Sequence, residues 1–283
     1  MEIKVLTGLP ITDILDVFNQ SFSDYFIPFE LSLDQLLTKM KADKTDLNIS
    51  VGVFENNTLI AFILHGSAIV NGNLIVYNGG TGVVPTKRGM GLTHQMYRFA
   101  LPILKAKGFN AIILEAITEN IQAIKSYEKA GFTKTRSLAC YKGIVHKKQL
   151  PIDIKIKELI DTPWMEMQRF WDIQPTWQNA IHVLNDNKDV TKTIGAFIND
   201  ELIGYLVFNV ANNRIHQISV AKNQRRKGIA SMLLSNISNS DKTEVSVINV
   251  DESSIASNSF FKFLGLDLFL KQYEVQLDLI SMK

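Results

Sequence analysis

The chain lacks the sequence features of a disulfide-bonded secreted protein, of a cysteine-based metal-binding protein and of a strongly charged protein. Cys140 is its only cysteine, so the chain can form no internal disulfide and has no cysteine spacing typical of a metal site. The formal net charge is only +2, too small to draw the whole molecule onto nucleic acid or an anionic membrane. No apolar run reaches the roughly 20 residues of a membrane span.

The sequence also lacks a signal-peptide pattern and closely spaced histidine pairs. The first ten residues lack the basic-then-apolar order of a signal peptide, and with the single cysteine this predicts a protein of the reducing cytoplasm. The histidines are scattered and none forms an i, i+4 pair, so we expect no metal ion. From the small net charge and the lack of a long apolar run we expect no nucleic-acid partner and no membrane partner. These histidines are His65, His94, His146, His182 and His216.

The composition is that of a soluble globular protein, with 46% apolar and 20% charged residues. A chain of 283 residues exceeds what one hydrophobic core usually needs, so two domains of roughly 140 residues are expected. The polar, basic segment from His146 to Pro151 lies near the middle. We therefore predict an N-terminal domain over 1–145, a linker over 146–152 and a C-terminal domain over 153–283.

The two halves repeat one order of elements: a strand, two helical regions, an antiparallel meander, a helix, a strand, a helix and final strands. Asparagine-containing dipeptides mark the expected hairpin turns in both halves, as at Asn56-Asn57 and Asn199-Asp200. The fold class predicted is α/β (α+β): in each half a mixed, mostly antiparallel sheet flanked by helices. Strand–helix–strand crossovers add local parallel pairing.

A glycine-containing turn joins a strand to a helix in the first half, at Val83–Leu92. The first amides of a helix have no internal partner and lie at the positive end of its dipole, and glycines let a phosphate approach them. Lys87 and Arg88 add positive charge at the rim. The turn therefore predicts a pyrophosphate site, although a plain turn with two surface cations explains the same residues. The spacing fits neither a Walker loop nor a dinucleotide fingerprint.

A second motif follows at Asn120–Phe132, and the two together resemble the GNAT acetyltransferase superfamily. Members show R/Q-x-x-G-x-G/A at the turn and N-x-x-A-x-x-x-Y-x-x-x-G-F in the next helix. Arg88–Thr93 fits the first pattern, with Thr93 in place of the usual small residue, and 120–132 fits the second at every stated position.

The resemblance implies two GNAT-like acyl-CoA N-acyltransferase domains and acetyl-CoA as the acetyl donor. Val83 and Val84 are then expected to present main-chain groups to the pantetheine arm. The other cofactor-binding residues implied in this half are Arg88, Gly89, Met90, Gly91, Leu92, Thr93, Asn120, Ala123, Tyr127 and Lys129.

The implied chemistry is direct attack of an amine on the thioester within a ternary complex. Tyr127 is expected to protonate the leaving thiolate, and Glu115 and Glu119 are candidate bases on position alone. Other interpretations stay open: Asn120 is also an ordinary N-cap residue, Tyr127 a core residue, and Gly131 a helix-ending glycine. Tyr25, Phe26 and Phe29 either line an acceptor pocket or belong to the core.

The second half carries a weaker copy of the same motifs. Arg225, Gly228 and Ala230 meet R-x-x-G-x-A, and the expected cofactor-binding residues there are Val220, Arg225, Arg226, Lys227, Gly228, Ile229 and Ala230. Aligning Phe261 with Tyr127 removes the hydroxyl that would protonate the thiolate. Ser254 then stands where Asn120 does, and Ser257 where Ala123 does.

Three functional hypotheses follow. The first is an N-acetyltransferase that acts on an amine of a small molecule or peptide and has its main site in the first half. The second is a non-catalytic acyl-CoA-binding or scaffold protein. The third places catalysis in the second half. A monomer is compatible with each, because tandem domains can mimic a dimer.

Overall fold

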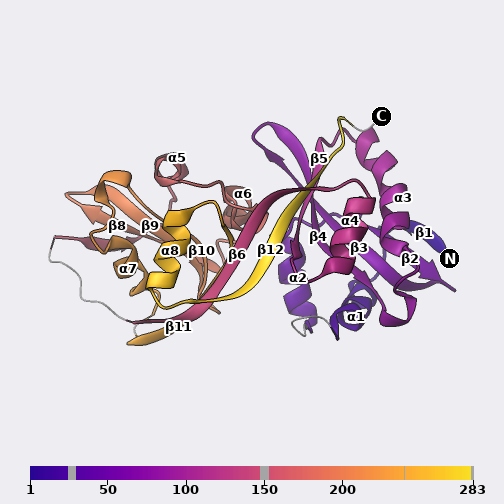
Figure 1. The fold of residues 1–283 in the computed structure, drawn as a ribbon, viewed down its shortest axis with the longest axis horizontal. Helices are drawn as coiled ribbons and strands as arrows, with labels where there is room; N and C mark the ends of the chain where they lie inside the picture. The colour runs from indigo at the N-terminus through magenta and orange to yellow at the C-terminus, as the bar shows by residue number, and fades with distance from the viewer. Residues whose placement is uncertain (25–29, 147–152, 239, 282–283) are drawn as a thin grey trace. The chain divides into compact units, whose positions relative to one another are not determined.

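A computed structural model describes residues 1–24, 30–146, 153–238 and 240–281. It forms two compact units: unit 1 comprises 1–135 and 273–283, and unit 2 comprises 136–272. Unit 1 contains, in chain order, β1 (Glu2–Val5), α1 (Ile11–Phe22), α2 (Leu33–Ala42), β2 (Val51–Glu55), β3 (Thr58–Val70), β4 (Asn73–Val83), the 3₁₀ turn η1 (Pro85–Lys87), α3 (Leu92–Ala106), β5 (Ala111–Ile117) and α4 (Ile121–Lys129) (Figure 1).

Unit 2 repeats this order with shorter helices. Its elements are β7 (Lys155–Glu158), α5 (Trp164–Met167), η2 (Gln168–Phe170), η3 (Trp177–Asn179), α6 (Ile181–Asp186), β8 (Thr191–Ile198), β9 (Glu201–Asn209), β10 (Arg214–Val220), η4 (Lys222–Gln224), α7 (Ile229–Leu234), β11 (Lys242–Asp251) and α8 (Ile255–Phe263). Two long strands, β6 (Thr133–His146) and β12 (Asp267–Asp278), each contribute to both units.

Each unit is completed by a strand from the other half of the sequence. The strand order in unit 1 is β1-β2-β3-β4-β5-β12, and in unit 2 it is β6-β11-β10-β9-β8-β7. Within unit 2, β6 pairs antiparallel with β11 from Leu138 to His146. In unit 1, Val275, Leu277 and Leu279 belong to the hydrophobic core. Residues 136–145, expected in the N-terminal domain, therefore belong to unit 2, and residues 273–281, expected in the C-terminal domain, belong to unit 1. Residues 147–152 of the expected linker lie outside the described residues.

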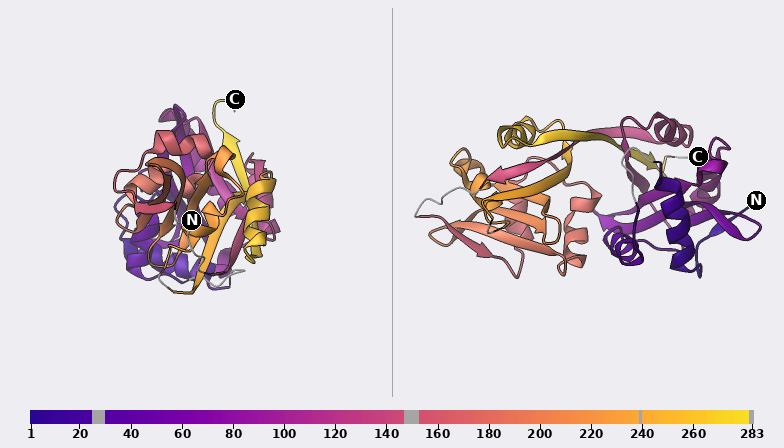
Figure 2. Two further views of the ribbon diagram at one scale, coloured as in Figure 1. Left: turned by 90° about the vertical axis from the view of Figure 1, so that its left-hand side faces the viewer. Right: turned by 90° about the horizontal axis from the view of Figure 1, so that it is seen from below.

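Helices cover both faces of the sheet in unit 1 (Figure 2). Ile14, Val17 and Phe18 are buried at helical spacing on α1, and Phe18 stacks on Phe62 of β3 at 5.7 Å between ring centroids. α2 packs beside α1, whereas α3 and α4 pack together. The capping box of Ser32 and Gln35 begins α2, because each side chain bonds the backbone amide of the other.

The dipeptides Asn56-Asn57 and Asn199-Asp200 form the predicted hairpin turns. Asn56 and Asn57 have φ of 50° and 63°, and they connect Glu55 and Thr58, which are paired across β2 and β3. Asn199 and Asp200 do the same between β8 and β9, with φ of 47° and 64°. Both central residues of such two-residue turns have positive φ, and this matches the twist of the flanking strands.

Two elements differ from what the sequence predicts. Ile229, Leu233 and Ile237 at helical spacing predict a helix that starts near Lys227, but the structure has only the six-residue α7, since Ser235 and Asn236 beyond it bond back to the carbonyls of Ser231 and Met232. The sequence also predicts two separate strands at 133–136 and 138–142, whereas the structure has one strand, β6, with no turn between them.

The exchanged strand yields a stability prediction. Leu277 of β12 is 2% exposed in the core of unit 1, so Leu277→Ala should lower the free energy of unfolding by about 2–4 kcal/mol. Leu268→Ala is the matched control, because Leu268 lies in the same strand but is 44% exposed, and it should cost under about 1 kcal/mol. Urea unfolding of both variants tests this, and equal losses would contradict the placement of β12.

Candidate active site

Each unit contains one parallel pair of strands that separates after a few residues. In unit 1, β4 pairs with β5 only from Ile75 to Tyr77. In unit 2, β10 pairs with β11 only at Arg214 and Ile215. Beyond these residues the facing edges of the two strands no longer bond each other within the described chain, so each unit can offer backbone groups to a ligand placed between them.

A turn with left-handed backbone follows each diverging strand, where the sequence predicts the phosphate site. In unit 1, Gly89 and Gly91 have φ of 78° and 70°, and Gly91 caps α3, which begins at Leu92. In unit 2 the corresponding residues are Arg226 and Gly228, with φ of 64° and 81°. A Cβ added to Gly91 or Gly228 would meet no atom within 4 Å, so a ligand can approach the backbone of both turns.

The first arginine of each turn anchors the scaffold. The Arg88 guanidinium donates to the carbonyls of Val83 and Ser21, and it pairs with both carboxylate oxygens of Asp24 at 2.7 Å. Arg225 repeats this arrangement: Nε donates to Val220 O at 3.0 Å, and a terminal nitrogen donates to Phe170 O at 2.9 Å.

The other terminal nitrogen of Arg225 lies 2.8 Å from Asp172 Oδ2. In both turns the arginine of the motif therefore ties the turn to the helical region before the sheet.

The two turns differ in charge. In unit 1, Lys87 pairs with Glu55 at 2.6 Å and Arg88 pairs with Asp24, so carboxylates neutralise both of the cations that the sequence placed at the rim. In unit 2, Lys227 bonds the neutral side-chain oxygen of Gln224, and exposed Arg226 has no carboxylate partner among the described residues. Two cations thus remain available to an anion in unit 2.

The remaining residues of the first turn and helix are placed as follows. Val84 and Leu92 are buried, Val83 and Thr93 are half-buried, and Met90 is 49% exposed. In the second turn, Val220 and Ile229 are buried and Ala230 is half-buried. Val84, Leu92, Val220 and Ile229 thus face inward, whereas Met90 of the first turn is exposed.

The helix after the second parallel strand starts and ends alike in both units. Asn120 caps α4 by accepting from the amide of Ala123 at 3.0 Å, and Ser254 caps α8 by accepting from Ser257. After α4, Gly131 N bonds Glu128 O and Phe132 N bonds Tyr127 O, which is a Schellman ending. Much of the second motif thus has a structural role in the helix, and the binding of a cofactor by Asn120, Ala123 and exposed Lys129 stays a prediction.

The candidate catalytic residues all lie in unit 1. Tyr127 is 9% exposed and packs edge-on against Tyr97 and Phe132. Half-buried Glu115 accepts a hydrogen bond from the Tyr77 hydroxyl at 2.7 Å, and exposed Glu119 accepts one from Thr118 at 2.8 Å. The equivalent of Tyr127 in α8 is Phe261, which stacks on Tyr141 at 5.7 Å. The residues proposed from position, Tyr25, Phe26 and Phe29, lie outside the described residues.

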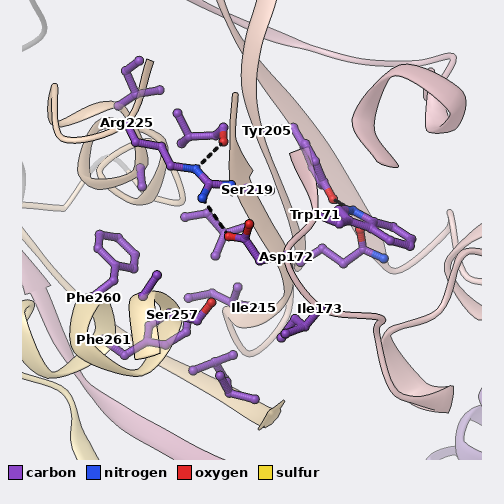
Figure 3. A pocket seen from close by; sticks show the side chains of 18 of the residues that line it. Trp171, Asp172, Ile173, Tyr205, Ile215, Ser219, Arg225, Ser257, Phe260 and Phe261 are labelled. Carbon is purple, nitrogen blue, oxygen red and sulfur yellow. Dashed lines mark hydrogen bonds and ion pairs between the residues drawn. The ribbon is translucent and has the colours of Figure 1, made fainter. Parts of the chain in front are cut away.

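A cavity of about 770 Å³ lies in unit 2, between the separated parts of β10 and β11. It extends from the turn at Arg225–Ala230 to the segment at Trp171–Asn179, and α8 supplies a further wall. Figure 3 shows Arg225 directed at Asp172, the Trp171 ring beside Tyr205, and Phe260 and Phe261 on the α8 side. The second turn, Val220 and α8 thus meet at one cavity, which the unit 1 residues Tyr127, Glu115 and Glu119 do not line.

Polar side chains in the wall of this cavity bond chiefly to one another. The Trp171 indole donates to the Tyr205 hydroxyl, which donates to Gln217 Oε1 at 2.7 Å. Gln217 Nε2 donates to Asn179 O at 2.6 Å. Burial raises the pKa of Tyr205 well above its ordinary value. Burial, with a contribution from the Arg214 charge, lowers the pKa of His216 to about 3, so this imidazole is neutral near pH 7.

Asp24 and Asp172, the partners of the anchoring arginines, were not predicted from the sequence, and neither was the wall formed by Trp171, Tyr205 and Gln217. Gln217 lies within a segment predicted to be a strand and is buried in the structure, and a buried amide needs partners. Among the described residues, no group of three or more His, Cys, Asp or Glu side chains is placed to hold a metal ion. No described helix is long and apolar enough to cross a bilayer.

Comparison with known proteins identifies the family. The model of the acetyltransferase (GNAT) family matches residues 13–132 and 156–266, so the chain belongs to this family and contains two copies of its domain. Membership supports acyl transfer as its general chemistry. No curated protein matched in a separate search.

Solved structures show the same tandem fold. A tandem GNAT protein from the clavulanic acid biosynthesis pathway aligns with a TM-score of 0.71 at 10% identity and 100% coverage of both chains. A GCN5-related N-acetyltransferase from Sphaerobacter thermophilus aligns with a TM-score of 0.71 at 14% identity, over 98% of this chain and 95% of that one. A glucosamine N-acetyltransferase region from a fungal multi-domain β-N-acetylglucosaminidase aligns with a TM-score of 0.71 at 13% identity, over 98% and 38%.

The low pKa of His216 predicts acid sensitivity of unit 2. The unfolded chain binds a proton on this imidazole near pH 6.5, and the folded chain only near pH 3. The unfolded state therefore binds more protons between these values, so stability falls as the pH is lowered from 6.5 towards 3. This group alone should cost about 2–3 kcal/mol at pH 4.5 relative to pH 7.5.

Urea unfolding at pH 7.5 and 4.5 measures this effect. His216→Gln should flatten the pH dependence of unit 2, whereas the matched change His146→Gln, at an exposed position on β6, should leave it intact. An unchanged pH dependence in the His216 variant would contradict the assignment.

Proposed function

We propose that this chain is an acetyl-CoA-dependent N-acetyltransferase whose acetyl donor binds in unit 2. The observation that carries the proposal is the cavity between β10 and β11, which reaches the left-handed turn at Arg225–Gly228. A long, flexible thioester with an anionic diphosphate at its far end suits a cavity of this form. The third hypothesis from the sequence, catalysis in the second half, is thus the one that the geometry favours.

The charge at the turn supports the same choice. A diphosphate needs amide donors and uncompensated positive charge. The unit 2 turn offers open backbone at Gly228 and two cations, Arg226 and Lys227, without carboxylate partners among the described residues. In unit 1 the equivalent positions are Gly89 and Met90, which carry no charge, and the two cations of that turn, Lys87 and Arg88, are paired with Glu55 and Asp24. The role proposed for unit 1 is to complete the fold of the tandem protein.

The expected reaction needs positioning more than it needs charged catalysts. Acetyl-CoA supplies the acetyl group as a thioester; the amine nitrogen bonds the carbonyl carbon, the C–S bond breaks, the nitrogen loses one proton and the thiolate gains one. The backbone edges of β10 and β11 beyond Ile215 can orient the reacting groups, and the apolar walls exclude water. Phe261 has no hydroxyl, so the thiolate is not protonated from this position of α8.

An amine acceptor is supported by the family and by one solved neighbour described as a glucosamine N-acetyltransferase region. A non-catalytic acyl-CoA-binding protein is the competing proposal. It predicts coenzyme binding without release of thiol in the presence of any amine, so a thiol-release assay separates the two.

Exchanging equivalent residues between the two turns tests the location of the site. Lys227 occupies the position that Met90 holds in unit 1. Lys227→Met should raise the Kd for acetyl-CoA about two- to tenfold and weaken its dependence on salt, because one cation near the diphosphate is lost. Met90→Lys, the matched control, should leave the Kd within about twofold of the original value. Calorimetry at low and high salt measures both variants.

A Kd unchanged by Lys227→Met, together with a Kd altered by Met90→Lys, would move the site to unit 1. A complete absence of binding in the parent chain would reject the proposal for both units.

A further inference from the structure

The cavity in unit 2 has two chemically different ends. One end is the turn at Arg225–Ala230, where the proposed function places the diphosphate. The other end is formed by Trp171, Ile173, Pro175 and Asn179, from the segment between η2 and α6. In Figure 3, Trp171 and Ile173 lie across the cavity from Phe260 of α8. An acceptor that meets the thioester must therefore contact this second end.

The second end offers little to a cationic acceptor. Asp172 is the only carboxylate in the described lining, and Arg225 already neutralises it at 2.8 Å. The other charged side chains of the lining, Arg225 and Arg226, are both cations, and His216 is close to Arg214. A polyamine or aminoglycoside would leave its additional ammonium groups without partners and near like charges, which is unfavourable.

The polar side chains behind Trp171 offer little to a polyhydroxylated acceptor. The hydroxyl of Tyr205 both accepts from Trp171 and donates to Gln217. The Gln217 amide donates to the carbonyl of Asn179, whose own amide donates to Ile248 O at 3.1 Å. These bonds hold Trp171 against Tyr205 and commit much of the hydrogen-bonding capacity of the wall. A sugar amine would lose water without equivalent bonds in return.

We propose that the acceptor is a compact primary amine with an apolar, ring-containing body and no second cationic group. This inference rests on the proposed function. The indole of Trp171, the side chain of Ile173 and the ring of Phe260 supply apolar contacts for such a body. The cavity also has to hold the thioester end of the donor, so a volume of about 770 Å³ favours a small acceptor.

A panel of three amines tests the acceptor class with the full chain and saturating acetyl-CoA. Thiol release should give a kcat/KM for 2-phenylethylamine at least about tenfold above that for spermidine and for glucosamine. The proposal is overturned if spermidine or glucosamine reacts as fast, or if none of the three reacts although acetyl-CoA raises the melting temperature. If acetyl-CoA binds neither unit, the proposed function itself fails, which is a different result.

A variant in the cavity wall tests the physical reason. Ile173→Asp places a carboxylate at the acceptor end and should lower the preference for 2-phenylethylamine over spermidine by about tenfold. Ile160→Asp is the matched control, because Ile160 is 86% exposed in the same unit and does not line the cavity; its preference should not change. The same shift in both variants, or none in the Ile173 variant while its acetyl-CoA stabilisation persists, counts against the wall as the origin of specificity.

Discussion

The candidate site depends on the separation of two parallel strands after only two paired positions, Arg214 with Ser246 and Ile215 with Val247. Hydrogen bonding along the whole of β10 and β11 would fill the space between them with backbone pairs. Instead, β10 continues to pair with β9 on its other edge up to Val220, so the strand stays ordered while its inner edge is released. The cavity, its backbone groups and its access to the turn at Arg225–Gly228 all follow from this one interruption.

The two units show how one scaffold supports different surfaces. Both retain the arginine that ties the turn to the preceding helical region, the capped helix after the second parallel strand, and the glycine that ends that helix. These features fix the backbone and are local or repeated. The differences lie in side chains that the scaffold does not need: Glu55 beside Lys87 in unit 1, and Arg226 and Lys227 without carboxylates in unit 2.

Features formed by neighbouring residues could be predicted from the sequence, whereas contacts between distant residues could not. The hairpins at Asn56–Asn57 and Asn199–Asp200, the order of elements and the two glycine-containing turns before α3 and α7 follow from short motifs whose physics involves neighbouring residues. The pairing of Arg88 with Asp24 joins residues 64 positions apart, and no spacing rule predicts it. The exchange of β6 and β12 between the units could not be predicted either, because alternating apolar residues indicate a strand but do not indicate which strand it pairs with.

The same limit explains why the sequence favoured the first unit as the active one. Tyr127 and the complete motif at 120–132 can be recognised in the sequence. A cavity, and the pairing of the cations at a turn with carboxylates, exist only in the folded chain. Even the strongest part of that motif, Asn120 with Gly131, is accounted for by the start and end of α4. The sequence motifs thus favour unit 1 as the active unit, and the cavity and charges of the folded chain favour unit 2.

If the acetyl donor occupies unit 2, a crystal structure grown with excess acetyl-CoA will show density for the thioester between β10 and β11, with the diphosphate at the amides of Arg225–Gly228. Density confined to the turn at Arg88–Thr93, or a unit 2 cavity left empty under saturating acetyl-CoA, would contradict binding in unit 2.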